Sequence, residues 1–421
     1  MSLSATNDKA AQNRFAAADA IDSSYAWLRL AINVAIGTVG GVGMWSIVVA
    51  MPAIQAEFGS DRGSASLPFT LLMLGLAPGT VLMGKLADRF GVVVPLMLGC
   101  VMLATGYFLS ALATSMTMLM LIFGLLIGML GTSAFFAPLM TDISFWFQKR
   151  RGLAIGLCAS GNYFAGAIWP PAIEHFIALY GWRATHLGIG AICLCIILPL
   201  ALLLRRKPPP QPMLQTAAGS AGGHSLNLSP RMLQTLLVVA GLGCCVAMSM
   251  PQVHIVAYCV DLGYGPARGA EMLALMLACG IISRSASGWI LDRIGGLSTL
   301  LLGATLQGMA LALYLPFDGL VSLYVISAIF GLVQGGIVPS YAFIIREMFP
   351  PAQAGFRVSL AISATLVGMA FGGWMSGAIF DLTGSYRVAL LNGIAWNLVN
   401  VGIVTWLLMR GRRLRLAAAI A

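Results

Sequence analysis

Long apolar runs dominate this sequence and leave few folds open to the chain. Twelve runs of spanning length follow one another, at 28–54, 64–87, 92–113, 117–141, 151–176, 183–204, 233–260, 269–291, 297–315, 320–346, 355–380 and 386–409. Each is long enough to cross a hydrocarbon core of about 30 Å. Charged residues make up only 9% of the 421 residues, against about 25% in a soluble domain. We therefore expect an all-α membrane protein with 12 transmembrane helices.

The basic residues lie in short clusters between the apolar runs. The net charge of +10 could indicate a nucleic-acid-binding protein, but clusters at span ends are typical of topology determinants. Eight cysteines all fall inside apolar runs and form no CxxC pair, so we expect neither disulfides nor metal ligands. No metal site and no cofactor are expected.

Most basic loop residues fall on one side of the membrane if both termini are cytoplasmic. Of the 24 Lys and Arg residues, the outer loops hold only Arg62, Arg183, Arg268 and Arg387, and Arg284 lies within a span. This bias predicts cytoplasmic N- and C-termini. Residues 1–27 lack an uninterrupted apolar core before a small-residue cleavage site, so we interpret them as a cytoplasmic tail. The short loops favour a bacterial inner membrane.

A polar segment at 205–232 divides the chain into two similar parts. It begins RRKPPPQP and continues with a Gly, Ala and Ser stretch, which is typical of a flexible linker. The loop 84–91 (GKLADRFG) matches 288–295 (GWILDRIG) at an offset of 204 positions. Further landmarks repeat at nearly the same offset: Pro138 with Pro339, Asp142 with Glu347, Gly152 with Gly355, and Arg183 with Arg387. We predict two six-helix bundles, 28–204 and 233–410, a cytoplasmic tail at 411–421, and a site between the bundles near midplane.

These motifs resemble those of a known family. The two GxLxDRxG-type loops are similar to the signature loop of the major facilitator superfamily. Four segments, 146–156, 180–183, 251–263 and 381–386, resemble the monocarboxylate porter and oxalate/formate antiporter group. The resemblance covers residues 28–410 and implies a two-bundle transporter that moves small carboxylates by alternating access.

Arg284 is the one basic residue within a span. It lies about 10 to 12 Å inside its helix, where a charge is costly and usually faces a wet cavity with a partner. All 14 acidic residues can be assigned to tails, loops or span ends, so we expect the anion to come from solution. A guanidinium fits a carboxylate through two parallel donors. The resemblance assigns its carboxylate anchor to the same place.

Alternatives remain open at this residue. Arg284 could instead bond helix carbonyls for structural reasons. Eukaryotic monocarboxylate porters have an aspartate one turn before this arginine and a lysine in the first helix. Here the earlier position is Gly280, and no lysine lies between Arg29 and Lys85. A single midplane cation predicts a substrate with one carboxylate, because a second would remain uncompensated.

Other polar residues could complete the site. His254, after Pro251 in the seventh span, is a candidate both for substrate binding and for carrying a coupled proton, because its unperturbed pKa is about 6.5. Asn162, Tyr163, Gln334 and Tyr341 are further substrate-binding candidates. Each of these could equally be a neutral residue in an interhelical hydrogen bond.

Charged residues repeat at the cytoplasmic ends of the spans. They are Asp88, Arg89, Asp142, Asp292, Arg293 and Glu347. We predict that they form a gating network that holds one conformation closed. The alternative is that the basic residues serve topology only.

The sequence therefore predicts a secondary active transporter of small organic anions, best fitted to monocarboxylates. Its partners would be the carboxylate, membrane lipid, and either a coupled proton or an exchanged anion. The alternative is a proton-linked exporter of drugs or amphipathic metabolites. An enzyme is not expected, because no nucleophile with a base, acid pair or metal cluster stands at one depth.

Overall fold

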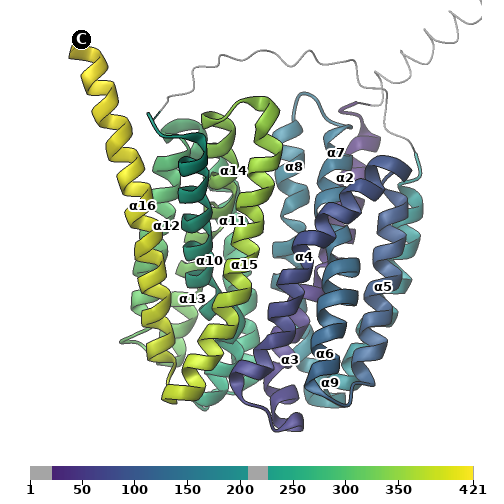
Figure 1. The fold of residues 1–421 in the computed structure, drawn as a ribbon. Coiled ribbons are helices and arrows are strands. Elements are labelled where there is room, and N and C mark those ends of the chain that lie inside the picture. Colours follow the sequence, from purple (N-terminus) through teal and green to yellow (C-terminus); the bar gives the residue numbers. More distant parts are fainter. Residues whose placement is uncertain (1–20, 207–225, 421) are drawn as a thin grey trace, which may run out of the picture.

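The computed structural model describes residues 21–206 and 226–420 of the chain. These residues form helices and turns with no strand, arranged as two groups of roughly upright helices side by side (Figure 1). The N-terminal half contains α2 (Ser24–Gly40), α3 (Val42–Phe58), α4 (Arg62–Phe90), α5 (Val93–Ala111), α6 (Met116–Leu121), η1 (Ile122–Gly131), η2 (Thr132–Phe135), α7 (Ala137–Ser144), α8 (Arg151–Ala159) and α9 (Gly161–Leu203). The C-terminal half contains α10 (Pro230–Asp261), α11 (Pro266–Ile294), α12 (Gly296–Leu313), α13 (Leu320–Gln334), α14 (Ile337–Met348), α15 (Pro351–Thr383) and α16 (Tyr386–Ile420).

The described residues contain twelve membrane crossings, as the sequence predicts. Eleven helical stretches are long and apolar enough to span a membrane, and one of them, 152–203, has 52 residues. At roughly 1.5 Å per residue it would measure about 78 Å, more than twice a hydrocarbon core of about 30 Å. Gly181, with φ 77° and ψ 163°, breaks it into two helices. Only glycine adopts this backbone conformation readily, so the break is built into the sequence.

The repeat in the sequence is also a repeat in geometry. Helix α4 ends at Gly91, which has φ 82° and ψ 168° and donates its N–H to the Ala87 carbonyl. Helix α11 ends 204 positions later at Gly295, with φ 80° and ψ 166°, donating to the Leu291 carbonyl. The fold is therefore two pseudo-symmetric six-helix bundles. Helix α16 continues through the residues expected as a C-terminal tail.

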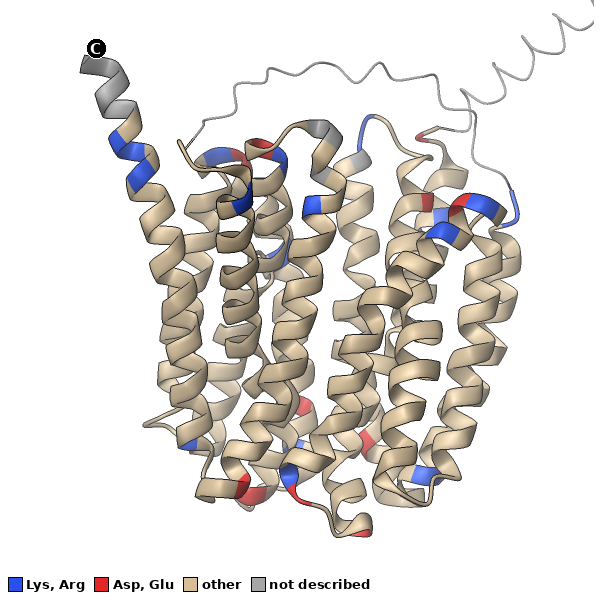
Figure 2. Cartoon of the chain, in the orientation of Figure 1, with Lys and Arg blue, Asp and Glu red and all other residues tan. Residues whose placement is uncertain are grey.

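Charge separates the two ends of the bundles. We call the end where α9 finishes and α10 begins the linker face, and the other end the opposite face. Figure 2 shows Lys and Arg gathered at the linker face, whereas Asp and Glu are prominent at the opposite face. This distribution agrees with the prediction that the linker face is cytoplasmic, which stays a prediction.

Candidate substrate site between the two halves

Three pairs of helices carry most of the packing between the halves. They are α4 with α15, α9 with α11, and α3 with α10. Helix α8, which forms the linker-face end of the fifth crossing, packs instead against α2, α7 and α9 of its own half. The contact between the halves is therefore concentrated away from the linker face.

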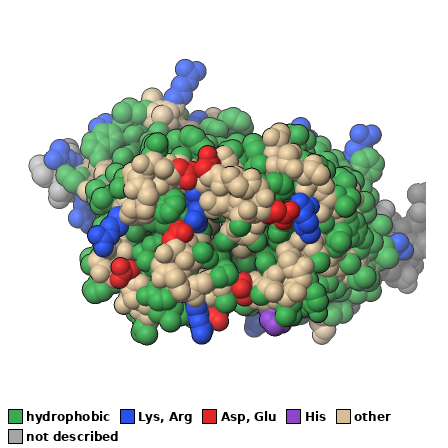
Figure 3. All heavy atoms as spheres, turned by 90° about the horizontal axis from the view of Figure 1, so that it is seen from below, with side chains coloured by type: hydrophobic (Ala, Val, Ile, Leu, Met, Phe, Trp, Pro, Cys, Tyr) green, Lys and Arg blue, Asp and Glu red, His purple; other side chains and the backbone are tan. Residues whose placement is uncertain are grey.

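At the opposite face, charged groups tie the halves together. The Arg62 guanidinium at the start of α4 lies 3.0 Å from an Asp261 carboxylate oxygen at the end of α10. The Asp381 carboxylate at the end of α15 accepts the backbone N–H groups of Arg62 (2.8 Å) and Gly63 (2.6 Å). A carboxylate is favourable at a helix N-terminus, where N–H groups are unpaired and the helix dipole is positive. We call Arg62, Asp261 and Asp381 the clasp. Figure 3 shows acidic and basic side chains interspersed across this face.

Arg62 is buried within the clasp. It is 7% exposed, and its guanidinium carbon lies 5.0 Å from the Phe380 ring centroid and 5.9 Å from that of Tyr386. Beside it, hydrogen bonds from the Ser64 side chain and backbone lower the pKa of Asp61, the residue that caps α4. The clasp thus encloses a paired charge between aromatic rings of the other half.

Toward the linker face, α4 and α15 separate. Their deepest hydrogen bond among the described residues runs from the Thr70 hydroxyl to the Ala370 carbonyl, at 3.1 Å. A side-chain carbon placed at Gly84, near the linker end of α4, or at Gly355, near that of α15, would meet no atom within 4 Å. The interface is closed at the opposite face and diverges toward the linker face (Figure 1).

Arg284 lies at the α9–α11 contact. Its guanidinium carbon is 5.2 Å from the ring centroid of Tyr163, which belongs to the other half. The side chain is partly exposed. Within residues 21–206 and 226–420, the four ion pairs closer than 4.0 Å involve other residues, so no carboxylate of this part of the chain neutralises Arg284.

Close packing fixes the backbone around Arg284. A side-chain carbon at Gly280, one turn earlier, would lie 2.5 Å from a Tyr163 ring carbon, so Tyr163 occupies the space that a larger residue would need. On the other side, the Gly335 N–H donates to the Ser283 hydroxyl at 3.1 Å. A side-chain carbon at Gly335 would lie 2.7 Å from the backbone nitrogen of Arg284. Helix α11 is therefore wedged between α9 and the α13–α14 junction at this point.

Two other predicted residues neighbour this contact in the chain. The backbone carbonyl of Asn162, next to Tyr163, accepts a hydrogen bond from the Trp45 indole N–H at 3.3 Å. Gln334, next to Gly335, is 1% exposed and accepts a hydrogen bond from the Gln252 amide at 2.6 Å. The Gln334 amide nitrogen has no hydrogen-bond partner among the described residues.

The structure places His254 and Tyr341 elsewhere, inside the C-terminal half. Tyr341 is buried and donates to Asn400 at 3.0 Å. His254 is also buried, with Nε2 2.7 Å from the Gly373 carbonyl and Nδ1 3.1 Å from the Tyr386 hydroxyl. Because a carbonyl can only accept, Nε2 carries the hydrogen. His254 thus adjoins the clasp, through Tyr386, rather than Arg284.

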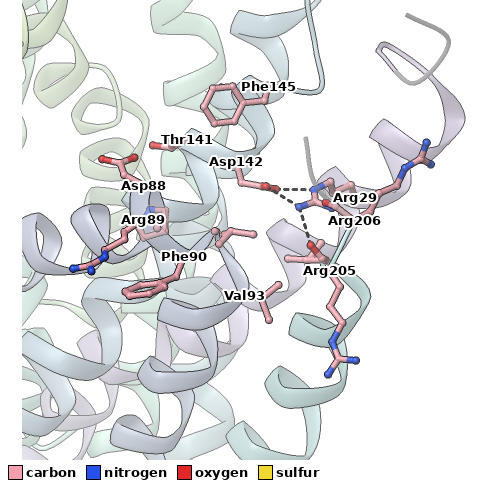
Figure 4. Close-up of a pocket in the computed structure, with 15 residues that line it drawn as sticks. Arg29, Asp88, Arg89, Phe90, Val93, Thr141, Asp142, Phe145, Arg205 and Arg206 are labelled. Carbon is pink, nitrogen blue, oxygen red and sulfur yellow. Dashed lines mark hydrogen bonds and ion pairs between the residues drawn. The ribbon is translucent and has the colours of Figure 1, made fainter. Parts of the chain in front are cut away.

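The six residues predicted as a gating network form no ion pair with one another in the described structure. Asp142 is buried and pairs with Arg29, whose Nη2 and Nε lie 2.7 and 2.8 Å from the two carboxylate oxygens. Figure 4 shows Asp88 and Arg89 across a pocket from this pair. Glu347, Asp292 and Arg293 are exposed, and Arg293 lies 3.7 Å from the Trp289 ring centroid. The gating network stays a prediction for another conformation.

Sequence reasoning missed Arg29, Arg62, Asp261 and Asp381. The available signal was their position: all four are charged residues at span ends of a chain with very few charges. Nothing in the spacing pairs them, because Arg62 and Asp261 are 199 positions apart and Arg29 and Asp142 are 113 apart.

Comparisons with known proteins agree with this architecture. The family model of the Major Facilitator Superfamily matches residues 34–320. Monocarboxylate transporter 13 of Rattus norvegicus is 29% identical over 351 residues, covering 81% of this chain and 78% of that protein. MFS-type transporter opdF of Penicillium oxalicum is 24% identical over 394 residues, covering 90% and 89%. A crystal structure of a bacterial homolog of the human lysosomal transporter Spinster, inward-facing and unoccupied, shares the fold with a TM-score of 0.68 and 16% identity, covering 92% of this chain and 97% of that one.

Proposed function

Because this chain belongs to the Major Facilitator Superfamily, we propose that it is a secondary active transporter of small organic anions, in which Arg284 binds the substrate carboxylate. The protein is a membrane transporter and not an enzyme, like the relatives it matches. The observation that carries the proposal is the guanidinium of Arg284, which stands at membrane depth without a carboxylate partner in the described chain.

The depth of Arg284 supports this role. It stands ten residues before the end of α11 at Ile294, or about 15 Å at 1.5 Å per residue. An unpaired cation there is costly, so a site that holds one is selective for an anion. A carboxylate can accept two parallel hydrogen bonds from the guanidinium fork.

The position between the halves supports transport rather than simple binding. Arg284 belongs to the C-terminal half and Tyr163 to the N-terminal half. A ligand held between them contacts both halves, so its affinity changes when the halves move relative to each other. A site shared by two repeats is what alternating access requires. Asn162 and Gln334 are the proposed additional polar contacts.

The substrate class follows from the charge available. One guanidinium compensates one carboxylate, which favours monocarboxylates over dicarboxylates. The monocarboxylate transporters among the relatives are consistent with this choice. The Tyr163 ring beside Arg284 provides an apolar surface for the rest of the substrate. The second candidate, a proton-linked exporter of drugs or amphipathic metabolites, would bind its substrate at the same contact between the halves.

Counterflow in proteoliposomes tests the proposal. Proteoliposomes that contain the purified protein are loaded with unlabelled lactate, pyruvate, formate, oxalate or an aromatic acid. Uptake of the same acid in labelled form is then followed. We expect Arg284→Gln to lower monocarboxylate uptake by about thirtyfold or more, since losing a charged partner in a desolvated site costs about 2 kcal/mol or more.

Arg268→Gln is the matched control. Arg268 is also on α11, is exposed, and forms its ion pair with Glu271 three residues later, so its removal should leave uptake unchanged. Wild-type uptake by Arg284→Gln would refute the assigned role. Uptake of aromatic acids without lactate or pyruvate would favour the exporter.

We also propose an inner-membrane location with the linker face in the cytoplasm. In intact bacterial cells, a membrane-impermeant thiol reagent should then label Asp61→Cys and leave Arg412→Cys unlabelled. The reverse pattern would overturn the orientation and leave the substrate proposal standing.

A further inference from the structure

A pocket of about 660 Å³ opens at the linker face of the N-terminal half. It is formed by the end of α4, the start of α5, α7 and the residues that follow α9 (Figure 4). It is separate from the Arg284 site, since Arg284 and Tyr163 do not line it. The predicted gating role uses three of its residues, Asp88, Arg89 and Asp142, and leaves the rest of the pocket without an assigned function.

The lining of this pocket carries excess positive charge. The lining includes four arginines, Arg29, Arg89, Arg205 and Arg206, and two aspartates, Asp88 and Asp142. Asp142 is already neutralised by Arg29 at 2.7 Å, and both are buried. Arg89, Arg205 and Arg206 therefore remain against Asp88 alone, and all three are exposed. Figure 4 shows their side chains extending in different directions, away from the buried pair. The Arg206 guanidinium carbon lies 4.9 Å from the Tyr25 ring centroid, so this side chain must turn to reach a ligand in the pocket.

Backbone groups add to this positive field. Gly91, Val92 and Val93 line the pocket where α5 begins. The helix has no side-chain hydrogen bond at its N-cap and no acidic residue in its first turn. Its first N–H groups and the positive end of its dipole are thus available to an anion.

Part of the pocket wall is apolar. Phe90 is 58% exposed, and Val93, Phe145 and Leu204 also line the pocket. A free inorganic anion would gain nothing from these groups. An amphiphile with an anionic head would bury some of its own apolar surface against them.

We propose that this pocket binds the phosphate of an anionic phospholipid headgroup from the leaflet at the linker face. Arg89, Arg205 and Arg206 supply the charge, the start of α5 supplies N–H donors, and Phe90 and Val93 contact the glycerol end of the acyl chains. Basic pockets between transmembrane helices on the cytoplasmic side bind such headgroups. The bilayer itself delivers this ligand to the depth at which the pocket lies.

The C-terminal half offers an internal comparison. A second pocket of about 530 Å³ occupies the equivalent place, lined by Gly295, Gly296 and Leu297 where α12 begins. Its charged side chains are Arg412 and Glu347, so it has no excess charge. We expect this pocket not to bind an anionic headgroup.

Thermal unfolding of the purified full-length protein in a neutral maltoside detergent tests the proposal. The probes are dioctanoyl-phosphatidylglycerol, dioctanoyl-phosphatidylcholine and inorganic phosphate, each titrated against the Tm. A ligand that binds the folded state raises the Tm in a concentration-dependent way. We expect a rise with phosphatidylglycerol only, and its apparent Kd should weaken as NaCl is increased.

The matched variants are Arg205→Gln with Arg206→Gln, and Arg412→Gln with Arg413→Gln. Both remove two exposed arginines from the linker face. The first pair should weaken phosphatidylglycerol binding about thirtyfold, from about 1 kcal/mol per arginine. The second pair should leave binding unchanged. If the first double variant does not fold, Arg205→Gln alone is expected to weaken binding about fivefold.

Three outcomes would overturn the proposal. An equal Tm rise with phosphatidylcholine would show detergent-like binding without headgroup recognition. An equal rise with inorganic phosphate would assign the pocket to a soluble anion. Equal weakening by the two double variants would mean that general surface charge, and not this pocket, attracts the lipid.

Discussion

The two halves of the molecule use equivalent acidic residues in different ways. In the N-terminal half, Glu57 at the end of α3 pairs with Arg183 of the same half at 2.7 Å. Its counterpart 204 positions later, Asp261, pairs instead with Arg62 of the other half. At the linker face, Asp142 is buried against Arg29, whereas its counterpart Glu347 is exposed.

The difference has a structural cause and a functional consequence. The position equivalent to Arg29 in the C-terminal half holds Leu233, so Glu347 has no buried cation to meet there. The N-terminal half pairs Glu57 and Asp142 with its own arginines, which stabilises the bundle itself. The C-terminal half contributes Asp261 and Asp381 to the clasp, which stabilises one arrangement of the two bundles. Charge therefore maintains the fold in one region and the conformation in the other.

The largest expected effect comes from breaking the internal pair at the linker face. Asp142→Asn leaves the Arg29 guanidinium, which is 1% exposed, without its charged partner. Removing one member of a buried ion pair costs about 3–5 kcal/mol of unfolding free energy. We expect a clear fall in the Tm measured in detergent, with the surviving folded protein still open at the linker face.

Glu347→Gln is the control for this prediction. Glu347 is exposed, and in residues 21–206 and 226–420 it has no ion pair within 4.0 Å. The Tm of the Glu347→Gln variant should therefore match that of the wild type. Equal Tm values for Asp142→Asn and the wild type would show that the Arg29–Asp142 pair does not hold the bundle together.

The second effect is on conformation and follows from breaking the clasp. Arg62→Gln removes a pair whose side chains are 9% and 29% exposed, intermediate between surface and buried pairs, so we assign it about 1–2 kcal/mol. The ratio of the two conformations should change about five- to thirtyfold toward opening at the opposite face. Spin labels at Lys85→Cys and Arg346→Cys, on opposite halves at the linker face, should report a shorter distance.

Arg183→Gln controls for loss of an arginine at the same face. It breaks the equivalent pair within the N-terminal half, so the distance between the labels should not change. An unchanged distance in Arg62→Gln as well would mean that the clasp does not set the conformation.

Much of the architecture could be predicted from the sequence. The spans and the repeat were predictable because apolar length and motif offset are local properties. Arg284 lies between the halves without a carboxylate partner in residues 21–206 and 226–420, which agrees with the expectation drawn from where the acids lie along the chain.

The pairing of charges could not be predicted in the same way. Arg62 and Asp261 come together only because α4 and α10 begin and end at the same face of neighbouring halves, which spacing does not encode. His254 was expected at the substrate cavity. The apolar residues of α10 surround the helix on all sides, so periodicity could not show which face carries His254. The actual face is turned toward Gly373 and Tyr386.

The smallest expected effect concerns pH and extends the comparison to the core beneath the clasp. His254 lies one hydrogen bond from Tyr386, whose ring lies 5.9 Å from the Arg62 guanidinium carbon. A proton added to His254 would place a second positive charge near Arg62 and weaken the closed clasp by repulsion. Acid should therefore raise the ratio of the conformation open at the opposite face to the closed one by a few fold. The His254→Gln variant should lose this pH dependence.

Gln can still donate to the Gly373 carbonyl, so folding and substrate binding should survive. The label distance between 85 and 346, followed from pH 8 to pH 5 in both proteins, measures this. Parallel pH profiles for the wild type and His254→Gln would exclude His254 as the titrating group. The clasp would then not respond to the protonation of His254.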